Sequence, residues 1–187
     1  MARNKKDKNK GKNPDSIRRR AYAWAEERLK DLKRGAKDDN SFLHSLRVAR
    51  PFENFSGKIY AAAILHDVPE DLGKTAKEVE SILDSVQKEF GTEVRFYVEQ
   101  LTNWHPDSAT RNFVVGSLVS KCSRLTIGPN VIKLSDRLDN LNSMGSVWDS
   151  DRQKRYAIEA LALLQVIPRT PREYTKLAGL EDELRAR

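Results

Sequence analysis

The sequence has a single cysteine among 187 residues, and this scarcity excludes two kinds of site. With Cys122 alone, the chain can form neither an internal disulfide nor a zinc site built from several thiolates. No stretch of about 18 apolar residues is present that could span a bilayer. The first residues also lack the apolar segment of a secretory signal. These features predict a soluble, cytoplasmic protein without membrane contact.

The positive net charge of +7 is not spread along the chain. Residues 1–20 contain nine Lys and Arg against two Asp, whereas the remaining residues contain twenty-five of each sign. Residues 1–14 have almost no apolar side chains, so we expect a disordered basic tail followed by one domain over residues 15–187. The tail could attach the protein to a nucleic acid or another polyanion, or it could simply aid solubility.

Alternating apolar and polar residues, the pattern of a half-buried strand, are absent from the sequence. Apolar residues instead recur at intervals of three and four, which predicts an all-α fold. No glycine-rich phosphate loop of the Walker or Rossmann type is present. The sequence therefore gives no sign of a nucleotide site built on a β-sheet.

The apolar pattern and its interruptions predict the helix boundaries. A capping box at Thr75 and Glu78 and a glycine at position 91 bound one of them. We expect Gly128-Pro129-Asn130 to break the chain and residues 102–110 to form a loop. The helices expected are residues 16–32, 42–49, 57–68, 75–90, 94–101, 113–124, 131–141 and 151–167, and one that begins near Thr170 and Pro171.

Polar residues interrupt two of the most apolar helices. His66 and Asp67 end a run of Ala and Leu, and Asp136 directly follows Val-Ile-Lys-Leu-Ser. Burying a carboxylate is costly unless a cation or hydrogen bonds compensate. Together with His44, these residues give two imidazoles and two carboxylates, a set suited to manganese, iron or zinc. A single histidine of this kind is more often a packed or surface residue, so the prediction depends on the combination.

Two more acids, Glu70 and Asp71, follow the His-Asp pair directly. They could act on a water bound at a metal, or they could belong to a solvated helix end. Asn140 lies four residues after Asp136, so both side chains should project from one face of a helix. Asn140 could present its amide to a substrate, or it could be an ordinary polar residue.

The four blocks that carry these residues resemble the hydrolase half of the RelA/SpoT alarmone family, in its small stand-alone form. The most specific matches are the His-Asp-x-x-Glu-Asp, Phe-Gly-x-Glu-Val and Lys-Leu-x-Asp-Arg-Leu-x-Asn segments. The matching blocks occupy residues 41–49, 62–71, 90–102 and 131–141.

The resemblance implies an HD-domain bundle of about 8–10 helices around a central metal site. It implies that Mn2+, or another divalent transition metal, is the cofactor. The residues that match the metal ligands are His44, His66, Asp67 and Asp136. Those that match the acidic pair acting on the attacking water are Glu70 and Asp71. Those that correspond to contacts with a guanine nucleotide are Asn140, Arg34, Lys33 and Ser143.

The chain also departs from the family pattern. Ser45 follows the first histidine where the family usually has proline, and Asp139 and Asn142 replace a histidine and an arginine. Lys33 and Arg34 could alternatively be charges at a helix C-terminus. The departures affect the expected substrate contacts more than the metal ligands.

The function predicted is hydrolysis of (p)ppGpp at its 3′ position, which yields GDP or GTP and pyrophosphate and places the protein in the stringent response. One alternative keeps the metal site but changes the substrate, as in a phosphatase of the wider HD superfamily acting on another nucleotide. The other is a non-catalytic protein that binds alarmone or RNA on an HD scaffold.

Overall fold

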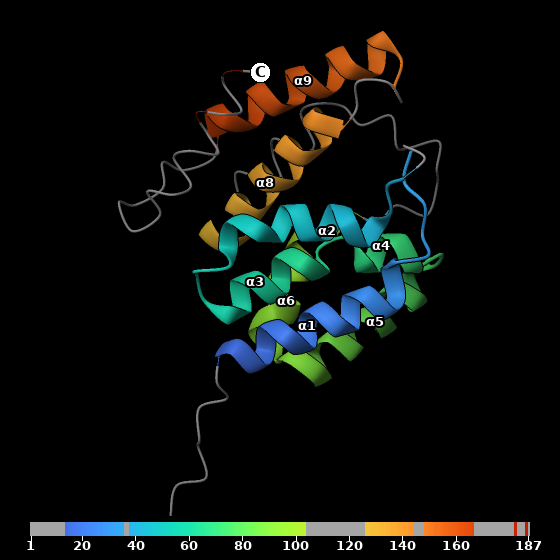
Figure 1. Ribbon diagram of the computed structural model, residues 1–187, viewed down its shortest axis with the longest axis vertical. Helices are drawn as coiled ribbons and strands as arrows, with labels where there is room; N and C mark the ends of the chain where they lie inside the picture. The colour runs from blue at the N-terminus through green and yellow to red at the C-terminus, as the bar shows by residue number, and fades with distance from the viewer. Residues whose placement is uncertain are drawn as a thin grey trace, which may run out of the picture.

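Helices make up the regular structure of the part of the chain that the computed structural model describes, residues 14–35, 38–103, 126–143 and 148–166 and the single residues 182 and 186. One isolated backbone bridge, between Lys33 and Asn40, is also present there. The prediction of an all-α fold is confirmed. The helices are α1 (Pro14–Leu29), α2 (Ser41–Ala49), the 3-10 turn η1 (Arg50–Phe52), α3 (Gly57–Leu65), α4 (Val68–Leu72), α5 (Ala76–Phe90), α6 (Thr92–Leu101), α8 (Ile127–Ser143) and α9 (Ser150–Val166) (Figure 1).

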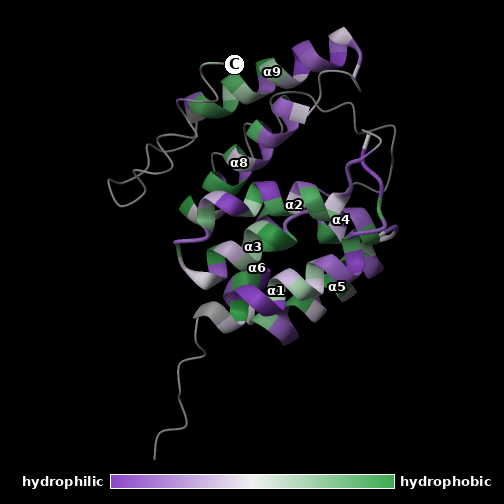
Figure 2. Ribbon diagram, viewed as in Figure 1, coloured by the Kyte–Doolittle hydropathy of each residue, from purple (hydrophilic) through white to green (hydrophobic). Residues whose placement is uncertain are grey.

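Helix α3 lies at the centre of this arrangement. It packs against α1, α2, α6 and α8, and it is one of the more hydrophobic helices in Figure 2. Ala61, Ala62 and Ala63 are fully buried. Small side chains allow neighbouring helices to approach closely, so α3 brings several elements together around its C-terminal end.

The other helices lie on two sides of α3. In the view of Figure 1, α8 and α9 lie above α2 and α3, whereas α1, α5 and α6 lie below them. Helix α8 packs against both α2 and α6, and α9 packs against α8. A hydrogen bond of 2.9 Å from the Ser135 hydroxyl to the Val48 carbonyl joins α8 to α2 within the core.

Most of the predicted helix boundaries agree with the structure to within a few residues. The capping box at the start of α5 is present, with the Thr75 hydroxyl accepting from the Glu78 backbone and the Glu78 side chain accepting from the Thr75 backbone. Gly91 follows α5 with a φ of 94°, a conformation that favours glycine. This turn lets α6 begin directly after α5 and pack beside it.

The predicted break at Gly128-Pro129-Asn130 is wrong, because these residues form the first turn of α8. Proline is tolerated there, since the first backbone N–H groups of a helix have no partner within the helix. Gly128 lies against the ring of Tyr97 on α6. The residues read as a break therefore begin the helix that carries Asp136.

Several predictions concern residues outside the described part of the chain. They include the basic tail up to residue 13, most of the predicted 102–110 loop, the helices expected at 113–124 and after Thr170, and Cys122. Among the described helices, none is both long and apolar enough to cross a membrane.

Replacing Gly73 with alanine should disturb α4. An added Cβ atom would lie 2.5 Å from Val79 Cγ2 and 2.7 Å from the Pro69 carbonyl oxygen, so the backbone would have to shift. We expect Gly73→Ala to lower the free energy of unfolding by about 1–3 kcal/mol, measured by urea denaturation.

Gly128→Ala is the matched control for this substitution. Its Cβ atom would meet the Tyr97 ring at 3.5 Å, an ordinary contact, and alanine has the higher helix propensity. The free energy of unfolding should stay within about 1 kcal/mol of the original value or rise slightly. Equal losses in the two variants would contradict the explanation based on crowding at Gly73.

Candidate metal centre

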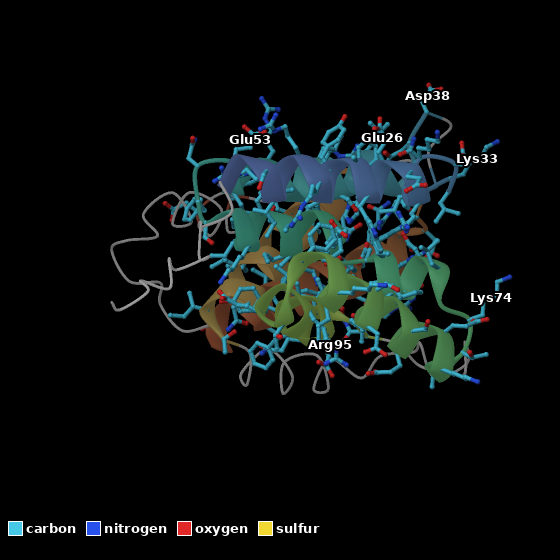
Figure 3. All side chains as sticks on the ribbon, turned by 90° about the horizontal axis from the view of Figure 1, so that it is seen from below. Glu26, Lys33, Asp38, Glu53, Lys74 and Arg95 are labelled. Carbon is cyan, nitrogen blue, oxygen red and sulfur yellow. The ribbon has the colours of Figure 1, made fainter. Side chains whose placement is uncertain are left out.

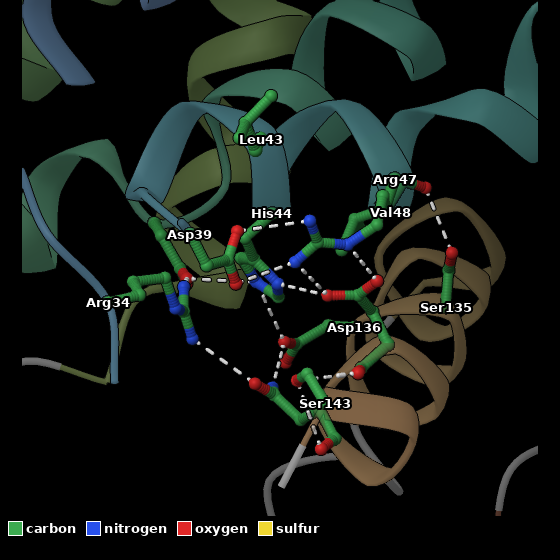
Figure 4. A network of polar contacts seen from close by, with 12 residues as sticks. Arg34, Asp39, Leu43, His44, Arg47, Val48, Ser135, Asp136 and Ser143 are labelled. Carbon is green, nitrogen blue, oxygen red and sulfur yellow. Dashed lines mark hydrogen bonds and ion pairs between the residues drawn. The ribbon is translucent and has the colours of Figure 1, made fainter. Parts of the chain in front are cut away.

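Four side chains from three separate parts of the chain meet beside the C-terminal end of α3. His44 comes from α2, His66 and Asp67 from the junction of α3 and α4, and Asp136 from α8. One ligand atom from each lies within 4.8 Å of all the others. Figure 4 shows His44 on α2 and Asp136 on α8 facing each other. The structure thus brings together all four residues predicted as metal ligands.

The adjacent residues His66 and Asp67 lie between two helices, and both face this point. Leu65 is the last residue of α3, and α4 begins at Val68 with Pro69 in its first turn. Proline cannot donate the hydrogen bond that would continue α3. The resulting change of direction places His66 Nε2 only 3.1 Å from Asp67 Oδ1.

Both imidazoles are held with the same nitrogen toward the centre. His44 Nδ1 lies 2.7 Å from Asp139 Oδ2, and His66 Nδ1 lies 2.8 Å from the Ala63 carbonyl oxygen. These oxygens accept hydrogen bonds, so each Nδ1 donates and each Nε2 offers its lone pair when the ring is neutral. Both Nε2 atoms are buried without a hydrogen-bond partner, as expected for nitrogens that bind a cation.

The distances between the donor atoms are compatible with one small ion. His44 Nε2 lies 3.3 Å from Asp67 Oδ2 and 3.4 Å from Asp136 Oδ1. A pair of imidazole nitrogens with two carboxylate oxygens suits Mn2+, Fe2+ or Zn2+ and leaves positions for water and substrate. These four residues therefore fit a divalent transition metal.

The electrostatics of the cluster favour positive charge at its centre. Burial lowers the pKa of His44, but its contacts with Asp136 and Asp139 outweigh burial and raise it to about 10. Burial likewise opposes the charged form of His66, and the nearby carboxylates raise its pKa to about 9. Without a metal, two protons would supply the positive charge that these carboxylates attract.

Asp136 has partners for both of its oxygens. Lys133 Nζ lies 2.7 Å from Oδ2, and the Asn140 amide donates to Oδ1 at 2.6 Å. Burial alone would raise the pKa of Asp136, but the charge of Lys133 and the histidine contacts hold it well below its usual range. Asn140 also bonds to the Tyr156 hydroxyl on α9 at 2.9 Å. The predicted shared face of Asp136 and Asn140 is thus observed, whereas sequence reasoning missed Lys133 and Tyr156.

The two predicted catalytic acids lie on α4, immediately after Asp67. Glu70 accepts a hydrogen bond from the Asn103 backbone at 2.6 Å, and burial together with the charge of Asp67 raises the pKa of its carboxyl. Asp71 is exposed as a residue, but its carboxylate contacts the hydroxyl of the buried Ser41. Desolvation of this carboxylate and the charge of Asp67 raise the pKa of Asp71 as well. Raised carboxyl pKa values favour proton exchange nearer to neutral pH.

The two basic residues before α2 lie differently from each other. Arg34 donates to Asp67 Oδ2 at 2.9 Å and to Asn140 Oδ1 at 3.2 Å, so it reaches the metal centre. Lys33 is exposed and lies at the edge of the molecule in Figure 3. Ser143, one turn beyond Asn140, donates its hydroxyl hydrogen bonds to carbonyls of its own helix. Of these three predicted substrate contacts, the structure brings Arg34 alone into the centre.

Asp139 and Arg47 form a further part of the centre that the sequence did not reveal. Asp139 stands where the family pattern has a histidine, and this departure was interpreted as a weaker substrate contact. The structure instead places its carboxylate between His44 and Arg47. The spacing of three residues from Asp136 was the available signal, because it puts both carboxylates on one side of α8.

Comparison with known proteins supports the fold without supplying a close relative. No family model matches the chain, and no curated protein matches its sequence. Among solved structures, it is similar to a metazoan ortholog of SpoT that hydrolyses ppGpp and plays a role in starvation responses, with a TM-score of 0.75 and 20% identity over 93% of this chain and 96% of the other. The two chains share a fold.

A structure from Listeria monocytogenes EGD-e is also similar, with a TM-score of 0.54 and 22% identity over 77% of this chain and 99% of the other. At these identities the similarity concerns the fold alone. The resemblance to small SpoT-type hydrolases that the sequence motifs indicated is confirmed at that level.

Metal binding should release protons from this centre. Because the pKa values of His44 and His66 are raised to about 10 and about 9, both rings carry a second proton and a positive charge at pH 7 in the metal-free protein. Metal ligation needs neutral imidazole, so binding must displace these protons. Calorimetric titration with Mn2+ should give enthalpies that differ between buffers according to their ionisation enthalpy, and affinity should increase from pH 6 towards pH 9. A binding enthalpy that is the same in every buffer would contradict this assignment.

Proposed function

We propose that the protein is a metal-dependent hydrolase that removes pyrophosphate from the 3′ position of (p)ppGpp. The observation that carries this proposal is the meeting of two unpartnered histidine nitrogens with two carboxylates, at 3.1–3.8 Å, beside two further acids. The proposal is also supported by the fold, which this chain shares with a ppGpp hydrolase. We propose Mn2+ as the ion, because the mixed nitrogen and oxygen ligands suit it.

The acids of α4 supply the base in the proposed reaction. When bound, the ion provides a Lewis acid for the phosphoryl group and lowers the pKa of water. Glu70 is the stronger candidate for accepting the proton of the attacking water, because its carboxyl is held by the Asn103 backbone. The water oxygen bonds to the phosphorus next to the ribose, the bond from this phosphorus to the 3′ oxygen breaks, and the 3′ oxygen takes up a proton. Asp71 would orient the same water from the edge of α4.

Arg34 and Asn140 are the proposed nucleotide contacts. The Arg34 side chain is 29% exposed, so it can reach a ligand while its pair with Asp67 keeps it at the centre. A guanidinium can bind phosphate oxygens or lie against a base. The remaining predicted contacts, Lys33 and Ser143, would be peripheral, because Lys33 is exposed and the Ser143 hydroxyl bonds to carbonyls of its own helix.

The direct test is to incubate the purified protein with ppGpp and Mn2+ and to separate the products. We expect GDP and pyrophosphate, and no turnover after chelation of the metal. Glu70→Gln should lower kcat by about 10²- to 10⁴-fold, the usual contribution of a general base, while Mn2+ binding persists.

Each alternative outcome of this assay has a distinct meaning. Release of orthophosphate, or turnover of another nucleotide in place of ppGpp, would indicate an HD-type phosphatase of different specificity. Binding of ppGpp or RNA without turnover in the metal-loaded full chain would indicate a binding protein. In that case, deletion of the basic residues 1–13 would show whether the tail retains RNA.

Arg34→Ala and Lys33→Ala form a matched pair of substitutions for substrate binding. Loss of a hydrogen bond to a charged group costs about 1.5–3 kcal/mol, so Arg34→Ala should raise KM about 10- to 100-fold. Lys33→Ala should leave KM nearly unchanged, since that side chain is exposed at the edge of the molecule. Steady-state kinetics would measure both values.

A separate measurement of metal affinity distinguishes substrate binding from damage to the metal centre. Arg34 competes with the ion for Asp67 Oδ2, so its removal should not weaken Mn2+ binding. An Arg34→Ala variant that lost Mn2+ and kept its KM would contradict the proposed role.

A further inference from the structure

Asp139 makes two different contacts with its two carboxylate oxygens. Oδ2 lies 2.7 Å from His44 Nδ1, and Oδ1 lies 2.6 Å from Arg47 Nε. The Asp139 side chain is 10% exposed and His44 only 1%, so the contact between them is almost closed to water. A charged hydrogen bond in such a place is strong and directional.

Arg47, one turn after His44 on α2, also holds the Asp139 carboxylate. Its second nitrogen, Nη2, also approaches Asp139 Oδ2 at 3.1 Å, and its guanidinium binds Asp39 through Nη1 at 3.0 Å and Nη2 at 2.9 Å. Figure 4 shows the Arg47 side chain facing Asp39. Asp139 therefore cannot turn away from His44 without losing its contact with Arg47.

The position of Asp139 decides which His44 nitrogen carries the proton. A neutral imidazole can hold its proton on either nitrogen, and only the form with hydrogen on Nδ1 leaves a lone pair on Nε2. In His44 the Nε2 atom is the one that faces Asp67 and Asp136. An anionic acceptor at Nδ1 selects the form that can bind a cation.

We propose that Asp139 is a positioning residue that holds His44 in the tautomer and orientation required for metal binding, with Arg47 as its counter-ion. This inference rests on the metal site of the proposed function and adds a residue that the sequence motifs do not assign to it. His66 obtains the same orientation from a neutral carbonyl, that of Ala63. The two histidines thus differ in basicity, because a carboxylate that accepts from Nδ1 makes Nε2 a stronger electron-pair donor to a metal than a carbonyl does.

Metal affinity is the first test of this role. Free Mn2+ has an electron paramagnetic resonance signal that is lost on binding, so titration with Mn2+ alone gives the dissociation constant without any assay of activity. Asp139→Asn should raise this constant about 10- to 100-fold, the range found when outer partners of metal ligands are changed. Asp139→Glu, which keeps the charge, should restore part of the affinity.

A spectroscopic test examines the tautomer directly. The chain has three histidines, which makes nitrogen-15 assignment of their rings straightforward. In protein loaded with diamagnetic Zn2+, the His44 Nδ1 proton should resonate far downfield, as expected for a proton shared with a carboxylate. Asp139→Asn should remove this signal and leave that of His66 in place, so His66 serves as an internal control.

A surface substitution of the same type completes the design. Asp84 is 69% exposed and pairs with Arg95 at 3.9 Å, away from the centre, so Asp84→Asn should change neither the dissociation constant nor the His44 signal. Arg47→Gln leaves the hydrogen bond from His44 to Asp139 intact, so it should weaken Mn2+ binding less than Asp139→Asn does. If Asp139→Asn does not fold, Arg47→Gln still tests the contact between Arg47 and Asp139.

The outcomes separate this inference from the proposed function. Unchanged Mn2+ affinity and an unchanged His44 signal in Asp139→Asn would overturn the positioning role, whatever the activity on ppGpp. Suppose instead that Asp139→Asn weakens Mn2+ binding, and that the original protein binds Mn2+ but does not hydrolyse ppGpp. These results would support the positioning role and overturn the proposed function. An original protein that binds no divalent metal would overturn both.

Discussion

The carboxylates of Asp67 and Asp136 lie within a helical core, and the surrounding helices compensate their charge. Buried carboxylates are stable only with hydrogen bonds or nearby cations. Here Lys133 lies 2.7 Å from Asp136 Oδ2, and Arg34 lies 2.9 Å from Asp67 Oδ2. The positions of α2, α3, α4 and α8 can be understood as the arrangement that satisfies this requirement. His44 and His66 complete the cluster, and a divalent cation bound there would further compensate the negative charge of the two carboxylates.

Local patterns in the sequence predicted the all-α fold and singled out four residues that the structure brings together. Intervals of three and four between apolar residues define helices, and a histidine, a His-Asp pair and an aspartate in apolar helices stand out against them. The four predicted ligands meet as expected. The error at Gly128-Pro129 arose because the same residues can end one helix or begin another. Their role depends on what precedes them and on the packing against Tyr97.

The outer residues of the centre could not be read from local patterns. His44 and Asp139 are 95 positions apart, and their contact exists because α2 packs against α8 in one register. A charged residue on a helix is usually a solvated one, so Asp139 and Arg47 gave no signal in the sequence beyond their spacing. Arg34 and Lys33 were indistinguishable as neighbouring cations, and the turn between α1 and α2 alone decides which of them faces the centre.

The break between α3 and α4 links the proposed ion to the placement of the acids that would act on water. His66 is the C-cap of α3 and Asp67 is the N-cap of α4, so a cation bound by both residues would connect the two helices. Helix α4 has only five residues and carries Glu70 and Asp71 within about one turn of Asp67. A helix this short has little stability of its own. An ion bound by His66 and Asp67 would therefore also help to hold Glu70 and Asp71 next to the bound water.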